Sequence, residues 1–266
     1  MATYHGLSYI ALIGFVSAFA TACSAQDVPA DPNPVDVSTP SETMTPEETE
    51  DWSVKPVQLN YEANGAPSDA VVLFDGSSLD AWQGDDGGDA PWLIDDGVVR
   101  VAAGKGGMTT RDSFCDAQIH LEWRTPETGV NGNGTGQGWG NSGVFLQSRY
   151  EVQVLNSFGN ETYSNGQAGS IYKQHPPLVN ASKPPQTWQT YDIIFKAPEF
   201  SADGDLLSPA FVTVLHNGVV VQNHSEIKGG TRYIGVPEYE PHGCAPLHLQ
   251  DHGEPVEYRN IWLRKL

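Results

Sequence analysis

Basic residues are scarce in this chain of 266 residues, which has 14 Lys and Arg against 33 Asp and Glu and a formal net charge of −19. Proteins that bind nucleic acid neutralise phosphates with clustered Lys and Arg, so we expect no nucleic acid partner. Long apolar runs are lacking too. The most apolar stretch, residues 1–22, is interrupted by Gly6, Ser8 and Gly14, whereas a spanning helix needs about 20 apolar residues. A polytopic membrane protein is therefore not expected.

Sustained helical periodicity and internal repeats are also lacking, which disfavours helical, propeller and solenoid folds. Instead, apolar and polar residues alternate in short segments beyond residue 68, and Gly, Asn, Asp and Pro bound these segments, as is typical of β-strands. We expect strands at 71–74, 98–102, 117–124, 142–155, 189–196, 210–216, 219–223, 245–251 and 256–265. Asn217-Gly218 favours a two-residue hairpin turn. The pattern predicts an all-β fold, an antiparallel β-sandwich or jelly roll.

The N-terminal segment has the features of an export signal. Residues 7–19 form an apolar core, and the small residues at 20–22 precede Cys23. A small residue before Cys resembles the lipobox of bacterial lipoproteins, in which the Cys carries the lipid. We therefore expect a signal peptide at 1–22, lipidation at Cys23, and a lipoprotein in the periplasm or on the cell surface that meets the membrane only through its lipid anchor. Simple secretion with cleavage nearby, or a retained anchor, are the alternatives.

The following segment, 23–68, is rich in Pro, Asp and Glu and poor in apolar residues. Such a composition cannot bury enough apolar surface to offset the entropy of ordering the chain. We expect a disordered linker that holds the folded domain, 69–266, away from a membrane, or a disordered tail with no spacing role. Within it, a short helix is expected to start at 45–48.

Cysteine is rare, with 3 residues in the chain. When Cys23 is assigned to the lipid, Cys115 and Cys244 remain as an even pair. Export to an oxidising compartment permits a disulfide between them, and two free buried thiols are the alternative.

Three of the expected strands carry polar rows opposite their apolar rows, because successive side chains of a strand point to opposite faces. The polar rows are His120, Glu122 and Arg124; Gln147, Arg149, Glu151 and Gln153; and His248, Gln250 and His252. We expect Glu122, Glu151 and His252 to lie on the same side of the sheet. These rows favour a ligand-binding concavity, and a solvated face with cross-strand ion pairs is the alternative. Trp139, Tyr163, Tyr172 and Trp188 lie in or beside loops and can stack on sugars or pack in the core.

Short motifs follow one another in order along the folded domain. They are Leu73-Phe74-Asp75-Gly76, Leu121-Glu122-Trp123-Arg124, Asn141-Ser142-Gly143-Val144, 150–156, Gly169-Ser170-Ile171-Tyr172, 188–191, His216-Asn217-Gly218-Val219, 249–253 and 256–261. Each motif alone is weak, but the ordered set spans 71–266 and is specific. The chain resembles the 3-keto-disaccharide hydrolase family, formerly a domain of unknown function, and the resemblance implies a concanavalin A-like β-sandwich.

The resemblance also implies an enzyme that cleaves the glycosidic bond of 3-keto glycosides or disaccharides, and the N-terminal signal makes it an exported one. In such a sugar the C3 carbonyl acidifies the hydrogen on C2, so a base can remove it and the oxygen on C1 can leave, by elimination or net hydrolysis. His252 and Glu151 or Glu122 fit the acid and base roles. The residues expected to bind substrate are Arg124, Trp139, Asn141, Arg149, Gln153, Tyr172 and Gln250.

A divalent metal cation that chelates the 3-keto and 2-hydroxyl oxygens is a further implication of the resemblance. The chain has no HExxH motif, no CxxC pair and no EF-hand spacing, so the metal's ligands and identity are unassigned. No nucleotide cofactor is expected. The loop 85–89 is rich in Asp and Gly and could supply oxygen ligands to Ca²⁺, and a flexible acidic loop is the alternative.

Two other functions remain open. A noncatalytic lectin-like carbohydrate-binding module on the cell surface suits the same fold, because a fold does not determine a function. A retaining glycoside hydrolase needs two carboxylates about 5 to 5.5 Å apart, and the sequence has no close Glu-x-Asp-x-x-Glu arrangement on a strand. All three functions share a carbohydrate as the partner.

Overall fold

The computed structural model describes residues 44–130 and 134–266, so the expected signal peptide, Cys23 and part of the expected linker lie outside the described residues. The chain divides into two compact units, 1–56 and 57–266. In the described part of the first unit, the 3-10 helix η1 spans Pro46–Thr49, where a short helix is expected. Over the described ranges, the structure contains no helix that is both long enough and apolar enough to cross a membrane.

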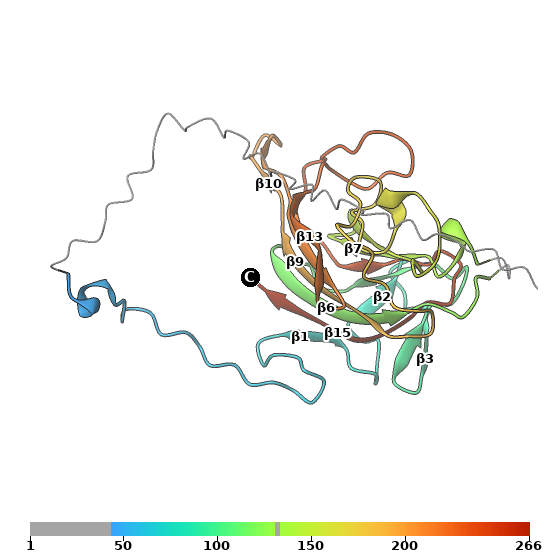
Figure 1. Ribbon diagram of the computed structural model, residues 1–266, viewed down its shortest axis with the longest axis horizontal. Helices are drawn as coiled ribbons and strands as arrows, with labels where there is room; N and C mark the ends of the chain where they lie inside the picture. Colours follow the sequence, from blue (N-terminus) through green and yellow to red (C-terminus); the bar gives the residue numbers. More distant parts are fainter. Residues whose placement is uncertain (1–43, 131–133) are drawn as a thin grey trace, which may run out of the picture. The chain divides into compact units, whose positions relative to one another are not determined.

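Two antiparallel sheets and their connecting loops build the second unit (Figure 1). The larger sheet has eight strands in the order β13 (Val219–Glu226), β12 (Phe211–His216), β9 (Gln189–Lys196), β6 (Ala117–Arg124), β15 (Glu257–Lys265), β4 (Val98–Arg100) and β3 (Leu93–Asp95), with β1 (Val71–Phe74) paired to β15. The smaller sheet has five strands in the order β2 (Trp82–Gly84), β5 (Met108–Thr110), β14 (His248–Leu249), β7 (Ser142–Leu146) and β8 (Tyr150–Val154). The predicted all-β sandwich is confirmed.

Shorter elements lie in the connections. The strands β10 (Glu199–Phe200) and β11 (Leu206–Ser208) form a two-stranded sheet, and the 3-10 helices η2 and η3 span Gly136–Gly138 and Ser164–Gly166. These pieces are two to three residues long. They are too short to show a periodic pattern, so the sequence does not predict them.

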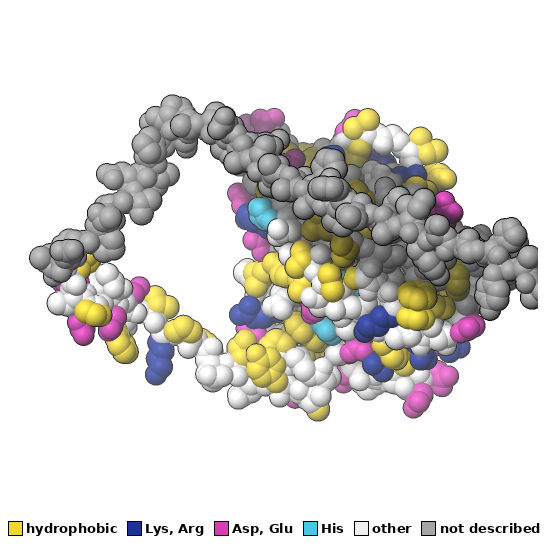
Figure 2. Space-filling view, viewed as in Figure 1, with side chains coloured by type: hydrophobic (Ala, Val, Ile, Leu, Met, Phe, Trp, Pro, Cys, Tyr) yellow, Lys and Arg dark blue, Asp and Glu magenta, His cyan; other side chains and the backbone are white. Residues whose placement is uncertain are grey.

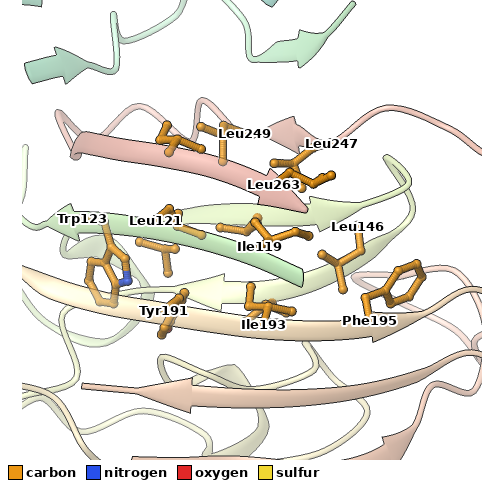
Figure 3. Close-up of a cluster of buried hydrophobic side chains, with 14 of the residues drawn as sticks. Ile119, Leu121, Trp123, Leu146, Tyr191, Ile193, Phe195, Leu247, Leu249 and Leu263 are labelled. Carbon is orange, nitrogen blue, oxygen red and sulfur yellow. The ribbon is translucent and has the colours of Figure 1, made fainter. Parts of the chain in front are cut away.

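The hydrophobic core lies between the two sheets (Figure 3). Every second side chain of β6 is buried, and Ile119, Leu121 and Trp123 point into the core, as the alternation predicts. Leu146 and Leu249 contribute from the smaller sheet. Truncation of one such Leu to Ala removes buried apolar surface and leaves a cavity, which typically costs about 2 to 5 kcal/mol of stability. The core therefore fixes the two sheets face to face.

One hairpin is predicted and a second is missed. Asn217 and Gly218 have φ angles of 54° and 78° between β12 and β13, so the expected tight turn is confirmed. The single strand expected at 142–155 is wrong, because Gln147 and Ser148 turn the chain with φ angles of 51° and 54°. Neither residue is the Gly or Asn that signals such a turn. The turn keeps the alternation in step, so the face assignments on both sides of it still hold.

Residues 57–68, which the sequence assigns to the linker, have contacts of their own in the second unit. Tyr61 and Pro67 form an isolated bridge, and Ala66 is buried. The amide of Asn260, in β15, donates a hydrogen bond of 3.1 Å to the Asn64 carbonyl. The compact unit thus begins at Val57.

Cys115 and Cys244 form a disulfide, with their Cα atoms 4.6 Å apart. Of the two states left open by the sequence, the structure has the bridged one. Cys115 precedes β6 and Cys244 precedes β14, so the bridge ties the larger sheet to the long connection that follows β13.

Candidate active site

A cavity of about 260 Å³ lies on the face of the smaller sheet that points away from the core. Its lining residues are Asn141, Phe145, Glu151, Gln153, Tyr172, Thr231, Tyr233, Gln250 and His252. Glu151 and Gln153 alternate along β8 with the core residues Val152 and Val154. Segments outside the sheet cover this outward face, so all five residues of β8 are buried. The segment with Tyr172 runs along the edge of β8, where its N–H donates a hydrogen bond of 3.1 Å to the Glu151 carbonyl.

Glu151 is the buried carboxyl group of the cavity, and 4% of its surface is exposed. Burial disfavours the charged form and raises the pKa of Glu151 to about 8. Gly143 on the neighbouring strand leaves the room that the carboxyl needs, because a Cβ atom at that position would lie 2.7 Å from Glu151 Oε1. A carboxyl group whose pKa lies near neutrality can both accept and release a proton under ordinary conditions.

Amide side chains beside Glu151 offer unpartnered oxygen atoms. Gln153, 1% exposed, donates from Nε2 to Asn141 Oδ1 at 3.2 Å. Its Oε1 atom is buried and has no hydrogen-bond partner among the described residues, and the same holds for Gln250 Oε1. A buried acceptor without a partner costs stability, and buried acceptors in proteins are normally satisfied by a donor. Hydroxyl groups of a bound sugar are donors that would satisfy them.

Tyr172 brings a phenol to the cavity. Its hydroxyl is 2.6 Å from the hydroxyl of Tyr163. Burial raises the pKa of Tyr172 above its usual value, and this hydrogen bond raises it further by a smaller amount. The phenol is therefore neutral and can donate a hydrogen bond. The ammonium of Lys173 lies 4.1 Å from the centroid of the Tyr163 ring, within the range of a cation–π contact.

His252 is exposed, at the rim of the cavity. It stands in a turn after β14 that the carboxylate of Asp251 holds in place. Asp251 accepts hydrogen bonds from the N–H of Gly253 at 2.8 Å and from the N–H of Gly106 at 3.1 Å. Gly253 has a φ of 82°, a conformation that glycine adopts without strain. The backbone of the turn therefore positions the imidazole, and no described residue forms a hydrogen bond to its ring nitrogens.

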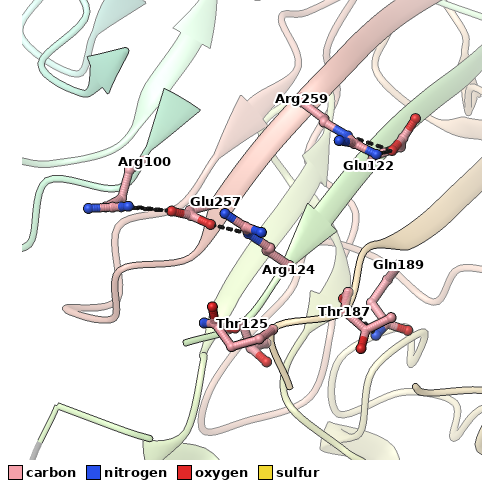
Figure 4. A network of polar contacts seen from close by, with 9 residues as sticks. Arg100, Glu122, Arg124, Thr125, Thr187, Gln189, Glu257 and Arg259 are labelled. Atoms are coloured by element: carbon pink, nitrogen blue, oxygen red, sulfur yellow. Dashed lines mark hydrogen bonds and ion pairs between the residues drawn. The ribbon is translucent and has the colours of Figure 1, made fainter. Parts of the chain in front are cut away.

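Glu122 and Arg124 lie elsewhere, on the outer face of the larger sheet (Figure 4). Glu122 accepts a hydrogen bond of 2.7 Å from Arg259, and Arg124 and Arg100 both bind Glu257. The expectation that Glu122 shares a side with Glu151 and His252 is wrong. A sandwich has two outer faces, and alternation along a strand does not tell which sheet the strand joins. On the face of the molecule shown in Figure 2, basic and acidic side chains lie beside one another.

Two further residues expected to bind substrate lie outside the cavity lining. The indole N–H of Trp139 donates a hydrogen bond of 3.1 Å to the Pro126 carbonyl. Arg149 borders a separate depression of about 220 Å³ and donates to the Gln147 carbonyl at 3.0 Å. The structure thus brings together Glu151, His252, Asn141, Gln153, Tyr172 and Gln250 from the expected set.

The sequence does not single out three lining residues, Phe145, Thr231 and Tyr233. Phe145 is the outward-facing alternate between Val144 and Leu146 in β7, so strict alternation gives its direction. Thr231 and Tyr233 lie in the long connection between β13 and β14, which has no periodic pattern, and nothing in the sequence indicates that it returns to β8.

The donor set of the cavity does not fit a metal centre held by the protein. Among the residues that the structure describes, no three or more His, Cys, Asp or Glu side chains gather where they could hold a metal ion. The lining contributes one carboxyl, Glu151, and one imidazole, His252, so no ligands are assigned to the divalent cation that the resemblance implies.

In the acidic loop 85–89, Asp85 Oδ2 accepts a hydrogen bond of 2.7 Å from the N–H of Gly107, which ties the loop to the segment that contains Gly107.

The family model described as the 3-keto-alpha-glucoside-1,2-lyase-like domain matches residues 69–264. A crystal structure of a "putative glycosyl hydrolase" from Parabacteroides distasonis ATCC 8503 is 46% identical, with a TM-score of 0.81, over 85% of this chain and 98% of that one. A second structure from the same organism, described in the same words, is 22% identical, with a TM-score of 0.53, over 74% of this chain and 94% of that one.

At 22% identity the second structure shows the shared fold alone. Among curated proteins, none matches the chain. The family match covers the sandwich from β1 to residue 264 in β15, including the strands and loops that bring Glu151 and His252 to one cavity. The chain therefore belongs to the family of 3-keto-alpha-glucoside-1,2-lyase-like domains.

Proposed function

We propose that this protein cleaves the glycosidic bond of 3-keto glycosides by removing the proton on C2 and expelling the oxygen on C1. Ketone formation at C3 makes the C2 hydrogen acidic, since the electron pair left on C2 delocalises onto the C3 oxygen as an enolate. Collapse of the enolate forms the C1–C2 double bond and breaks the C1–O bond. The proton from C2 goes to the enzyme, and the leaving oxygen receives one. Addition of water to the product then gives net hydrolysis.

Glu151 is the base in this scheme. Its pKa of about 8 makes its carboxylate a far stronger base than an exposed Glu, while a usable fraction is ionised at neutral pH. Its position deep in the cavity keeps the carboxyl away from bulk water, which the burial of all β8 residues supports. This buried carboxyl with its raised pKa is the observation that carries the proposal.

Hydrogen-bond donors and acceptors around Glu151 fit a sugar ring. The neutral phenol of Tyr172 can donate to the C3 oxygen, where negative charge develops in the transition state. The unpartnered oxygens of Gln153 and Gln250 can accept from sugar hydroxyls and so fix the ring with its C2 hydrogen toward the base.

His252 is the acid. Imidazole is the side chain that most often transfers a proton in enzyme catalysis. Its place at the cavity rim suits a leaving oxygen that must depart toward solvent. A retaining mechanism would instead need a second carboxyl about 5 to 5.5 Å from the first, and Glu151 is the one carboxyl among the described lining residues.

The decisive experiment compares a 3-keto disaccharide with its unoxidised parent. Release of free sugar from the oxidised substrate alone supports the proposal, and loss of the C2 hydrogen, followed by NMR with a substrate deuterated at C2, identifies the bond that breaks first. Release from both substrates would favour a retaining hydrolase. Binding of the 3-keto disaccharide without turnover would favour the noncatalytic lectin-like module.

Export is a second part of the proposal. The disulfide between Cys115 and Cys244 supports folding in an oxidising compartment, because such bridges persist outside the cytosol. We propose that the protein is a lipoprotein with its lipid on Cys23. Labelling with radioactive palmitate should be lost in Cys23→Ser, whereas equal labelling of wild type and variant would contradict the anchor.

A further inference from the structure

The cavity has room for one sugar ring, so the group bonded to C1 must lie outside it. Its volume of about 260 Å³ is smaller than the roughly 300 to 1,000 Å³ of pockets that bury larger ligands. Glu151 and Gln153 are almost fully buried, whereas Tyr233 and His252 are exposed. A ring whose C2 faces Glu151 and whose C1 oxygen faces His252 therefore directs its leaving group toward the exposed rim, to which both His252 and Tyr233 contribute.

Tyr233 belongs to a closed loop, residues 229–238, whose two ends meet. The N–H of Gly230 donates a hydrogen bond of 2.9 Å to the Glu238 carbonyl. At Gly229, where φ is 133°, an added Cβ would lie 2.4 Å from the backbone of Glu238. Only glycine permits this close approach, so the loop has a defined neck.

The same loop is anchored to the wall of the cavity. The N–H of Thr231 donates to the Arg149 carbonyl at 2.8 Å, and the Thr231 hydroxyl accepts from the N–H of Glu151 at 3.0 Å. The ammonium of Lys173 lies 5.2 Å from the centroid of the Tyr233 ring. These contacts tie residues 230, 231 and 233 to their neighbours beside the cavity, and the tip of the loop, 233–236, continues from there.

The tip is apolar and exposed. Tyr233, Ile234 and Val236 are 72%, 83% and 74% exposed, respectively. Apolar side chains gathered on a loop that rims a cavity are a mark of a binding surface. A second sugar as leaving group would need several hydrogen-bond partners, and the tip's side chains offer one hydroxyl. A flat apolar group, by contrast, would remove their surface from water at a gain of about 25 cal/mol per Å².

We propose that the tip of this loop, Tyr233, Ile234 and Val236, is a leaving-group subsite that takes an apolar, aromatic aglycone. The inference rests on the proposed function and adds to it the substrate class: 3-keto glucosides of aromatic alcohols are better substrates than those of small alcohols.

Two substrates with leaving oxygens of similar acidity test the subsite, the methyl and the 2-phenylethyl 3-keto-glucoside. Both carry an alkyl oxygen, so a difference between them reports contacts of the phenyl ring. Wild type should show a kcat/KM at least tenfold higher for the 2-phenylethyl substrate, and Ile234→Ser/Val236→Ser should reduce that ratio about tenfold, equivalent to about 1.4 kcal/mol. The control is Leu93→Ser, an exposed apolar residue on β3 at 66% exposure, which should leave the ratio unchanged.

Each outcome has a distinct meaning. A wild-type enzyme that turns over both substrates with equal kcat/KM, or an Ile234→Ser/Val236→Ser enzyme that keeps the wild-type ratio, would overturn the subsite and leave the proposed function standing. Turnover of neither substrate by wild type would overturn the proposed function, and the subsite with it.

Discussion

The carboxyl group of Glu151 occupies the space that a side chain at residue 143 would fill, and Gly143 leaves it free. Because the added Cβ would come within 2.7 Å of Oε1, we expect Gly143→Ala to push the carboxyl out of line and lower kcat at least tenfold. The free energy of unfolding should fall by about 1 to 3 kcal/mol, as for other overpacked sites. Gly243→Ala, where an added Cβ meets nothing within 4 Å, is the control and should match wild type in kcat and in chemical denaturation.

Two glutamates on opposite faces of the sandwich form a matched pair of variants. Glu151→Gln keeps the shape of the side chain but removes the base, so turnover of a 3-keto glycoside should fall by roughly two to four orders of magnitude. Glu122→Gln breaks an ion pair with Arg259 on the larger sheet, away from Glu151. Its turnover should stay within about twofold of the wild-type value. Steady-state kinetics of both variants check this, and a loss of activity confined to Glu122→Gln would reverse the assignment.

The pH dependence follows from the raised pKa of Glu151. The carboxylate is the active form, so kcat/KM should rise about tenfold per pH unit below pH 8 and level off above it. The folded state binds the Glu151 proton up to about pH 8, and the unfolded state loses it near 4.5. This contribution to stability is therefore fully present below about pH 4.5 and is lost as pH rises to about 8.

Glu151→Gln lacks this titration, which gives a control by denaturation. As the pH rises from 5 to 8, the free energy of unfolding of Glu151→Gln should increase relative to that of wild type, by at most about 1.4 kcal/mol per pH unit. Parallel stability curves for the two proteins across that range would show that burial does not raise the pKa of Glu151.

His252→Ala should lower turnover by roughly two to four orders of magnitude, since a positioned acid contributes about that much. Substrate affinity should change less, because the imidazole lies at the rim and the amides hold the ring. An external imidazole buffer should restore part of the activity. His224→Ala changes an exposed histidine in β13 on the other sheet and should leave kinetics unchanged. Wild-type turnover in His252→Ala would remove the histidine from the mechanism.

Removal of residues 1–56 should leave a folded and active protein, because the second compact unit begins at Val57 and contains the whole cavity. Thermal unfolding followed by circular dichroism should stay cooperative, and kcat/KM should equal that of the full chain. A broad, noncooperative transition would show that the sandwich needs the preceding segment.

Alternation predicted much of the fold and part of the site. The period of two in β6 and β8 gives their core-facing rows correctly, because one face of each strand packs against the other sheet. The same period cannot distinguish the two sheets of a sandwich, which is why Glu122 is misplaced. Thr231 and Tyr233 escape prediction for another reason, since a long irregular connection reaches β8 through tertiary hydrogen bonds that leave no local pattern.

The place of β15 in the larger sheet has a consequence for how the chain is made. It lies between β6 and β4 and also pairs with β1, although it follows all three in sequence by more than 130 residues. None of these strands can complete its pairing until residues 257–265 have left the ribosome, so the sandwich has a high contact order and closes late. A chain that stays unfolded during synthesis can pass through an export channel before it folds. Truncation within β15 should therefore impair folding more than removal of the N-terminal unit does.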